Sequence, residues 1–374
     1  MIEYVEIRDT NRNLIGIVDT AESIIWESSY YSTGRFEVYV QANSETIPLL
    51  QVGNYVTRPN ERNIGIIEGI NITYLPVYGR MIIASGRFAK SILDRRLIYT
   101  LRGNSITPTI SSGLVEAAVR NLVNKNIIAS SLSRRNIPFI KLGTLQNITK
   151  RIVDDNGNSA RMQTSYGNLL EYTDTMLQEF GLGAYMSLDY ATNNLLYNVF
   201  EGADRSASNT QGNNPVVFSQ EYDNLVSTDY RYETVTEKTT ALIGGEGEGT
   251  ERYFVMIGDT ASGIARKEVM VDASGQSRTY EDEDETEHTY TDAEYAELLK
   301  SYALKEMEEY QIVQTFSGEV DVSHSDLVYG VDYNVGDIIT IHDMQLSLYM
   351  NTRILTATEV QDSSGYKLSI TYGV

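Results

Sequence analysis

The sequence contains no cysteine among its 374 residues. Disulfide bonds and thiolate metal sites are therefore excluded, and the composition fits folding in a reducing cytoplasm. Histidine is almost as scarce: the three histidines are far apart, and none has the spacing of a zinc-protease motif. No apolar run is long enough to span a membrane, and the acidic opening MIEYVEIRD predicts no secretory signal peptide.

Basic side chains are few in the second half of the chain. Residues 201–374 hold 11 basic and 33 acidic side chains, whereas residues 1–200 hold 19 and 18. Residues 80–151 alone carry 13 basic side chains against two acidic ones, without a helix-turn-helix or aromatic-interleaved pattern. We therefore expect this segment to face an acidic surface of the same assembly, in the same chain or a neighbouring subunit, ahead of DNA. The candidate inter-subunit contacts are Arg95, Arg96, Arg134 and Arg135.

A nucleotide-binding motif is also missing, although the stretch ALIGGEGEGTERYF (Ala241–Phe254) is rich in glycine. A phosphate loop needs a lysine after the glycines and a helix whose N–H groups face the anion. Here Glu246, Glu248 and Glu251 would repel phosphate, and the following residues RYFVMI are typical of a strand. The pattern predicts a β-hairpin with a closely packed backbone.

No catalytic, cofactor or metal motif is recognisable. The acidic run EDEDETE (Glu281–Glu287) fails as an EF-hand loop, because Glu287 stands where a glycine is required. It instead predicts a solvated loop before a helix that begins with a Thr291–Glu294 capping box. No GxSxG motif is present, and nothing singles out a pair of carboxylates for glycoside hydrolysis. We therefore expect no enzymatic activity.

The hydrophobic pattern is mainly that of a β protein. Short runs rich in Ile, Val, Tyr and Phe fill the first hundred residues and return after residue 221. Helical periodicity appears at 111–126 and at 167–181, where Gly181 is placed to end the helix, and again after Thr291. No long-period internal repeat stands out. The 27 tyrosines suit half-buried strands and protein–protein surfaces.

The order of these elements resembles the tail-hub, or tail-associated, proteins of long-tailed bacteriophages, prophages and tailocins, which share the fold of the baseplate hub of contractile-tailed phages. Four stretches carry the resemblance: IIWESSYYSTGRFEVYV (Ile24–Val40), a helix and hairpin at Asn168–Ser206, the glycine-rich segment Asn224–Phe254, and the ending YNVGDIITI, TRILTATEV and YKLSITYG. Together these stretches cover most of the chain.

This resemblance implies an α+β, mainly β fold, with two similar β-barrel tube domains and peripheral α/β domains. The expected domains are a first barrel at 1–102, a helix-containing α/β domain at 103–223, a second barrel at 224–271 plus 312–374, and an inserted acidic loop and helix at 272–311. It also implies a homotrimer whose six barrels form a pseudo-sixfold ring, closing the tail tube and leaving a channel for DNA.

The expected partners of such a hub are the distal tail or tail tube ring, the tape measure protein, and tail fibre or tip proteins. DNA would only pass through the channel, for which Glu246, Glu248 and Glu251 are candidate lining residues. The protein would be made in the host bacterial cytoplasm and reside at the virion tail tip. The alternatives are a β-rich carbohydrate-binding adhesin or, further behind, a cell-wall hydrolase.

Overall fold

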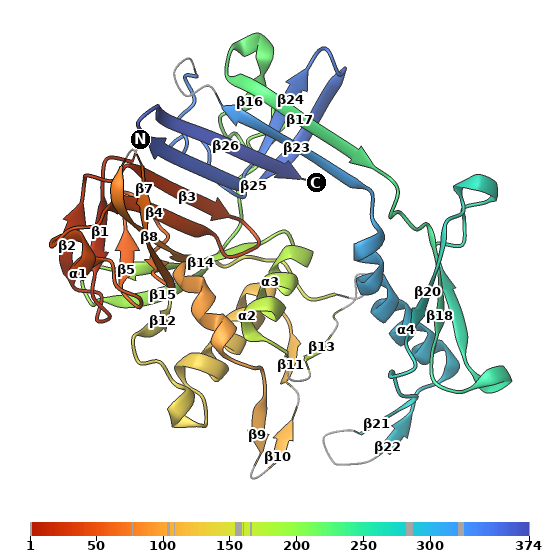
Figure 1. The fold of residues 1–374 in the computed structure, drawn as a ribbon. Helices are drawn as coiled ribbons and strands as arrows, with labels where there is room; N and C mark the ends of the chain where they lie inside the picture. The colour runs from red at the N-terminus through yellow and green to blue at the C-terminus, as the bar shows by residue number, and fades with distance from the viewer. Residues whose placement is uncertain are drawn as a thin grey trace. The chain divides into compact units, whose positions relative to one another are not determined.

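The computed structural model describes residues 2–76, 78–102, 105–107, 109–153, 159, 161–164, 167–281, 287–320 and 325–373 (Figure 1). The chain divides into two compact units. The large unit comprises Met1–Val153, Ser159–Asp229 and Phe316–Val374, and the inserted unit comprises Asp154–Asn158 and Tyr230–Thr315. Both units are built mainly of strands with a few helices, so the prediction of a mainly β, α+β fold is confirmed.

A ten-stranded sheet dominates the large unit. Its main path runs β17-β23-β26-β25-β3-β4-β8-β7, and β16 and β24 extend it beside β25. These strands are β3 (Ser23–Ser29), β4 (Arg35–Gln41), β7 (Gly69–Leu75), β8 (Gly79–Arg87), β16 (Val217–Ser219), β17 (Leu225–Glu233), β23 (Val313–Val320), β24 (Ile338–Asp343), β25 (Leu348–Asp362) and β26 (Gly365–Gly373). Strands from both predicted barrels thus share one open sheet.

A smaller four-stranded sheet, in the order β2-β1-β5-β6, covers the first part of this sheet. Its members are β1 (Val5–Arg8), β2 (Leu14–Val18), β5 (Tyr55–Thr57) and β6 (Gly65–Ile66), and the short helix α1 (Thr46–Leu49) lies beside β2. Alternate residues of β3 and β4, among them Trp26, Phe36 and Val38, point into a fully buried core with Val5 and Ile7. The period of two in the sequence therefore marks this core correctly.

The middle of the large unit is an α/β layer. It contains the helices α2 (Val115–Val123) and α3 (Leu169–Glu179), the 3₁₀ helices η1 (Ala89–Arg95) and η3 (Ser133–Arg135), and the π-helix η2 (Asn124–Ile128). The 3₁₀ helix η4 (Gln220–Tyr222) instead follows β16 and lies beside β24. The strands of the layer are β9 (Thr100–Arg102), β10 (Ser105–Thr107), β11 (Thr109–Ser112), β12 (Ile140–Leu142), β13 (Arg161–Thr164), β14 (Gly183–Asp189) and β15 (Asn194–Phe200). Its core also takes in Ile64 and Ile92, which precede residue 102 in the sequence.

Single residues mark both ends of α3, and the sequence predicted the one at its C-terminal end. The Asn168 side chain accepts hydrogen bonds from the N–H groups of Leu170 and Glu171 at the start of α3. Gly181 adopts a φ of +61° after the end of that helix, which is the left-handed conformation expected of the residue that terminates it.

The inserted unit has its own core. The strands β18 (Thr240–Gly244), β19 (Phe254–Ile257) and β20 (Glu268–Asp272) pair in the order β19-β18-β20, and α4 (Asp292–Met307) packs on them. It further contains η5 (Gly249–Glu251), η6 (Gly263–Ala265), η7 (Glu308–Tyr310) and the hairpin β21 (Thr279–Glu281) with β22 (Glu287–Thr289). The predicted capping box is confirmed, since Thr291 and Glu294 exchange hydrogen bonds. Most of the acidic run, 282–286, lies outside the described residues.

Candidate assembly surface

The ten-stranded sheet contains the same strand pattern twice. The first copy of the pattern, repeat 1, is β3-β4-β8-β7, and the second, repeat 2, is β17-β23-β26-β25. Within each repeat, the four strands are counted in the order in which the chain forms them. The first strand pairs with the second, the second with the fourth, and the fourth with the third. The inserted unit lies in the sequence between the first two strands of repeat 2, where repeat 1 has only the short connection 30–34.

The repetition extends to single residues at one turn. Val52-Gly53-Asn54 precedes β5 in repeat 1, and Val335-Gly336-Asp337 precedes β24 in repeat 2. The two glycines have φ angles of +92° and +96°, a region that side chains with a Cβ rarely adopt.

The backbone hydrogen bonds of the two turns match as well. In repeat 1, the Gly53 N–H donates to the Ile67 carbonyl and the Ile67 N–H donates to the Asn54 carbonyl, both at 2.8 Å. In repeat 2, Gly336 donates to Ile354 at 2.8 Å, and Ile354 donates to Asp337 at 2.9 Å. Both isoleucines are fully buried. The two halves of the sheet are therefore built on one plan.

No long-period repeat stands out in the sequence, although the sheet uses one strand order twice. The similarity between the two repeats that can be read in the sequence is one short motif, Val-Gly-Asn in repeat 1 and Val-Gly-Asp in repeat 2, each followed by a strand. The repeat is hard to see because its first two strands are separated by five residues in one copy and by the whole inserted unit in the other.

The two repeats join edge to edge. β25, the third strand of repeat 2, pairs antiparallel with β3, the first strand of repeat 1, from Thr356↔Ser29 to Asp362↔Ser23. In the part of the chain that the structure describes, β7 and β17 each have one strand neighbour, so they are the two ends of the path. β7 is the third strand of repeat 1, and β17 is the first strand of repeat 2. A third strand and a first strand also pair at the junction inside the chain, where β25 meets β3.

Polar contacts reinforce the junction between the repeats. Arg58 Nη1 donates to Glu359 Oε1 at 3.0 Å, and Arg58 Nη2 also pairs with Glu61 Oε2 at 2.7 Å. Tyr366 donates to Glu359 at 2.8 Å, and burial and the neighbouring carboxylate raise the pKa of this tyrosine. A cavity of about 680 Å³ opens beside this cluster. Arg58, Glu61 and Glu359 on its wall pair with one another, whereas Arg62, also on the wall, lies over the Phe200 ring.

The four predicted basic contact residues have different surroundings. Arg95 and Arg134 are exposed. Arg96 donates from Nε to the Arg135 carbonyl at 3.1 Å, and Arg135 is buried with its guanidinium 4.0 Å from the Tyr99 ring centre. The structure therefore leaves Arg95 and Arg134 available to a partner, while Arg96 and Arg135 make contacts within the chain.

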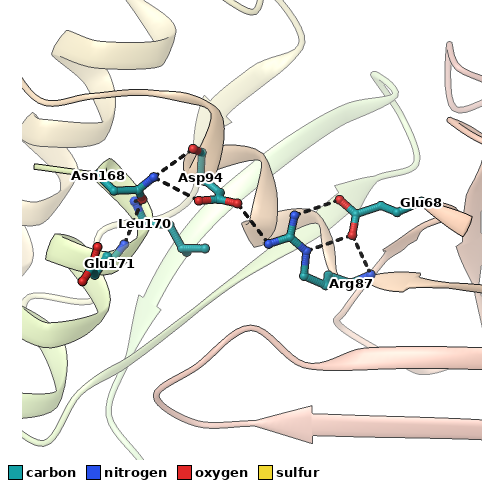
Figure 2. Close-up of polar contacts among 6 residues, drawn as sticks. All are labelled: Glu68, Arg87, Asp94, Asn168, Leu170 and Glu171. Carbon is teal, nitrogen blue, oxygen red and sulfur yellow. Dashed lines mark hydrogen bonds and ion pairs between the residues drawn. The ribbon is translucent and has the colours of Figure 1, made fainter.

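Other basic side chains of the 80–151 segment are neutralised inside the large unit. Figure 2 shows Arg87 between two carboxylates: it donates from Nε to Glu68 at 2.8 Å and from Nη1 to Asp94 at 3.1 Å. The hydrogen bond from Arg87 lowers the pKa of Glu68. Asp94 in turn accepts from the Asn168 amide at 3.0 Å, which links the end of β8 to the start of α3. The charge excess of the segment is thus smaller in space than in sequence.

The glycine-rich loop is a hairpin, as predicted. β18 and β19 pair antiparallel from Ala241↔Ile257 to Gly244↔Phe254. A Cβ at Gly245 would lie 2.7 Å from the Tyr295 hydroxyl, so the glycine permits close packing against α4. Glu246, Glu248 and Glu251 are all exposed, and the Glu246 carboxylate also accepts from the Arg278 N–H at 2.7 Å.

A protein-family model matches the chain over residues 4–374, nearly its full length. Its description is that of a siphovirus ReqiPepy6 Gp37-like protein. The chain belongs to this family. The comparison with curated proteins gives no significant match.

Two solved structures share the fold. The tail protein from Neisseria meningitidis MC58 is similar with a TM-score of 0.60 at 14% identity, covering 99% of this chain and 95% of that one. The 43 kDa tail protein of prophage MuSo2 from Shewanella oneidensis gives a TM-score of 0.57 at 12% identity, covering 99% and 98%. At such identities the likeness shows the fold alone.

Family and fold agree with the resemblance inferred from the sequence: the chain belongs to a siphovirus protein family and has the fold of known phage tail proteins. A structural role in the tail, the coarser part of the predicted function, is consistent with this family and this fold. Among the described residues, no helix is both long and apolar enough to cross a bilayer. The same part of the chain holds no cluster of three or more potential metal ligands.

Proposed function

We propose that this Gp37-like protein is the hub of the tail tip, a homotrimer that closes the tail tube and leaves a channel for DNA. The role requires shape and symmetry and no catalytic group. Its neighbours would be a distal tail or tail tube ring and the tape measure protein on one side, and tail fibre or tip proteins on the other.

The observation that carries this proposal is the pair of matching sheet edges. Inside the chain, the third strand of repeat 2 pairs with the first strand of repeat 1. The same contact between β7 of one copy and β17 of the next would join copies head to tail, as heterologous ring interfaces require. Three copies would then present six similar repeats, which is the symmetry that mates a trimer with a sixfold tube.

The outer face of the shared sheet is the natural wall of the channel in this arrangement. This face lies opposite the apolar core and carries small polar residues such as Ser85, Thr358 and Ser369. It also carries the ion pair of Glu27 with Arg35, the apolar residues Ile25 and Val360, and Lys367 as an exposed basic residue. With few unpaired basic side chains, such a wall would hold DNA phosphates only weakly. Glu246, Glu248 and Glu251 on the inserted unit remain candidates for an additional carboxylate ring.

The exposed basic side chains Arg95 and Arg134 are proposed to face carboxylates of a neighbouring subunit or ring. The second half of the chain supplies such a surface, because it carries 33 acidic and only 11 basic side chains. Contacts of this kind steer association and set its register more than they add affinity.

Native mass spectrometry of the purified chain tests the oligomer, and crosslinking tests the edge contact. The chain lacks cysteine, so N71C on β7 and D229C on β17 can be introduced together and joined with a short bismaleimide. Within one chain these strands are the two ends of an eight-strand path, roughly 30 Å apart. A trimeric mass and covalent trimers on a denaturing gel are expected.

Each single-cysteine variant, and N71C combined with Y190C on an exposed turn of the large unit, serves as the control and should stay uncrosslinked. A purely monomeric protein at micromolar concentration would contradict the proposed function. A trimer without the N71C–D229C link would retain the hub but refute this edge contact.

A further inference from the structure

Within the described part of the inserted unit, α4 covers only one face of the three-stranded sheet (Figure 1). Ala241 of β18 is fully buried on that face. Successive residues of a strand point to opposite faces, so the neighbouring positions point away from α4. The strand register brings four apolar side chains together there, at Leu242, Phe254, Met256 and Met270. We call the surface that these four residues form the open face.

The open face is too apolar for a sheet that faces water. Phe254 and Met270 are each 47% exposed, and Met256 is 46% exposed. A hollow of about 350 Å³ lies among Leu242, Met256 and Met270. A sheet with one wet face alternates apolar and polar residues, whereas β18 and β20 are parallel and carry apolar residues at successive positions. This is the pattern of a sheet that is packed on both faces.

The margin of the open face is acidic. Arg252 pairs with Asp272, and Arg266 pairs with both Asp259 and Glu268. In these pairs the carboxylate side chains are 57–67% exposed, whereas the arginine side chains are only 23–25% exposed. A molecule that approaches the face therefore contacts carboxylates around an apolar centre. The complementary surface is apolar, with Lys or Arg along its sides.

A second copy of this chain is a poor match for the open face. Residues 230–315 hold 20 acidic and 8 basic side chains, so two inserted units repel one another. The apolar sides of α2 and α3 are buried in the core of the large unit, and that of α4 is buried in the inserted unit. These three are the longest helices that the structure describes, so a second copy offers no long helix with a free apolar side. This favours an occupant from another protein.

From these observations we propose that the open face binds an amphipathic helix of another protein, with an apolar stripe over Met256 and Met270 and with Lys or Arg beside the stripe. Three strands are roughly 10 Å wide from first to last, about the diameter of one helix. The bound helix forms a third layer opposite α4. Methionine side chains adapt to apolar surfaces of different shape, which suits such a contact. The proposal concerns the inserted unit alone and does not depend on the trimeric hub.

Titration of the full chain with a model peptide tests the proposal. The peptide is a dye-labelled helix of Leu and Lys, about 18 residues long, with all leucines on one side. A peptide of the same composition with the leucines scattered is the control for charge alone. We expect fluorescence anisotropy to show binding of the first peptide and about tenfold or more weaker binding of the second. A first peptide that does not bind overturns the proposal.

Variants of the apolar centre locate the peptide. M256Q/M270Q should weaken binding about tenfold or more, because two apolar contacts are lost. M344Q, which changes an exposed methionine of the large unit, is the matched control and should bind like wild type. Undiminished binding to M256Q/M270Q would place the peptide elsewhere on the chain and refute the proposed site.

The acidic margin has a test of its own. E268Q/D272N should weaken binding of the peptide at low salt, because it removes two carboxylates beside the apolar centre. E297Q neutralises an exposed carboxylate of α4, which lies on the covered face of the sheet, and should have little effect. Equal losses per charge in the two variants would assign binding to the net charge of the unit and contradict the proposal.

Thiol labelling in assembled tails shows whether the open face is occupied there. M256C places a single thiol on the open face of a chain that has no other, and L304C places one on an exposed position of α4 as the control. M256C should react freely with a maleimide dye in the purified chain and about tenfold or more slowly in tail particles, while L304C reacts equally in both. M256C that labels equally in both, or that is already protected in the purified chain, overturns the proposal.

Discussion

Gly53 and Gly336, at matching turns of the two repeats, allow the cost of backbone strain to be separated from the cost of a side-chain clash. Gly53 and Gly336 have nearly the same φ, but a Cβ at Gly336 would overlap the Tyr30 ring, whereas one at Gly53 would find its nearest atom, Thr10 Cγ2, at 3.6 Å. We expect G53A to cost about 1–2 kcal/mol through the backbone, and G336A about 2 kcal/mol more through the clash. Urea unfolding of both variants measures this difference, and equal losses would contradict it.

Tyr30 ties three parts of the large unit together through one hydroxyl. It donates to the Gly181 carbonyl at 3.0 Å and accepts from the Gly202 N–H at 3.1 Å. Burial raises the pKa of Tyr30 to about 12. The folded state therefore favours the neutral phenol, so this stabilisation is complete below pH 10 and is lost as the pH rises toward 12.

Y30F should accordingly lower the free energy of unfolding by about 1–2 kcal/mol near neutral pH, since two buried backbone groups lose their partner. The difference from wild type should shrink between pH 10 and 12. Y190F, on an exposed tyrosine, is the control. A difference from wild type that stays constant over this range would rule out the coupling to titration.

At the scale of elements, a buried ion pair fastens η1 to α3. Lys90 is 2% exposed, and its Nζ lies 2.9 Å from Asp174 Oδ1 and 3.2 Å from the Tyr31 carbonyl. Burial lowers the pKa of Lys90 and raises that of Asp174, so both charges are costly on their own. The pair therefore holds only while both partners are present.

K90M should destabilise the protein by about 3–5 kcal/mol, because it leaves a buried carboxylate unpaired. The double variant K90M/D174L should recover most of this loss. Chemical denaturation of the two single variants and the double variant completes the cycle. Additive losses would show that the two side chains do not depend on each other.

At the scale of the whole molecule, the exposed basic side chains predict a salt-dependent assembly. R95E combined with R134E should weaken trimer formation or ring binding at low salt and make the variant insensitive to added salt, because the attraction it removes is screened. Mass photometry over a salt series measures this effect. K300E, outside the basic segment, is the control, and unchanged assembly of R95E/R134E at low salt would contradict the proposal.

Much of the fold follows from local patterns in the sequence. The alternation in β3 and β4, the Gly181 helix end, the Thr291–Glu294 capping box and the hairpin around Gly245 were all predictable, because each depends on residues a few positions apart. The pairing of β25 with β3, more than 300 residues apart, was not predictable in this way. Neither was the intrachain use of Arg96 and Arg135, since charge counted along the chain does not show which carbonyls and rings lie nearby.

The sequence by itself determined that this protein is mainly β, that its glycine-rich loop cannot cradle a phosphate, and that it resembles the phage tail hubs. These conclusions rest on periodicity, turn chemistry and charge, which act over a few residues. Only the tertiary structure decided that both halves of the chain share one sheet, joined by β25 and β3 and ending in two matching edges. That outcome depends on hydrogen bonds between strands far apart in the chain, and the inserted unit separates the strands whose equivalence reveals the repeat.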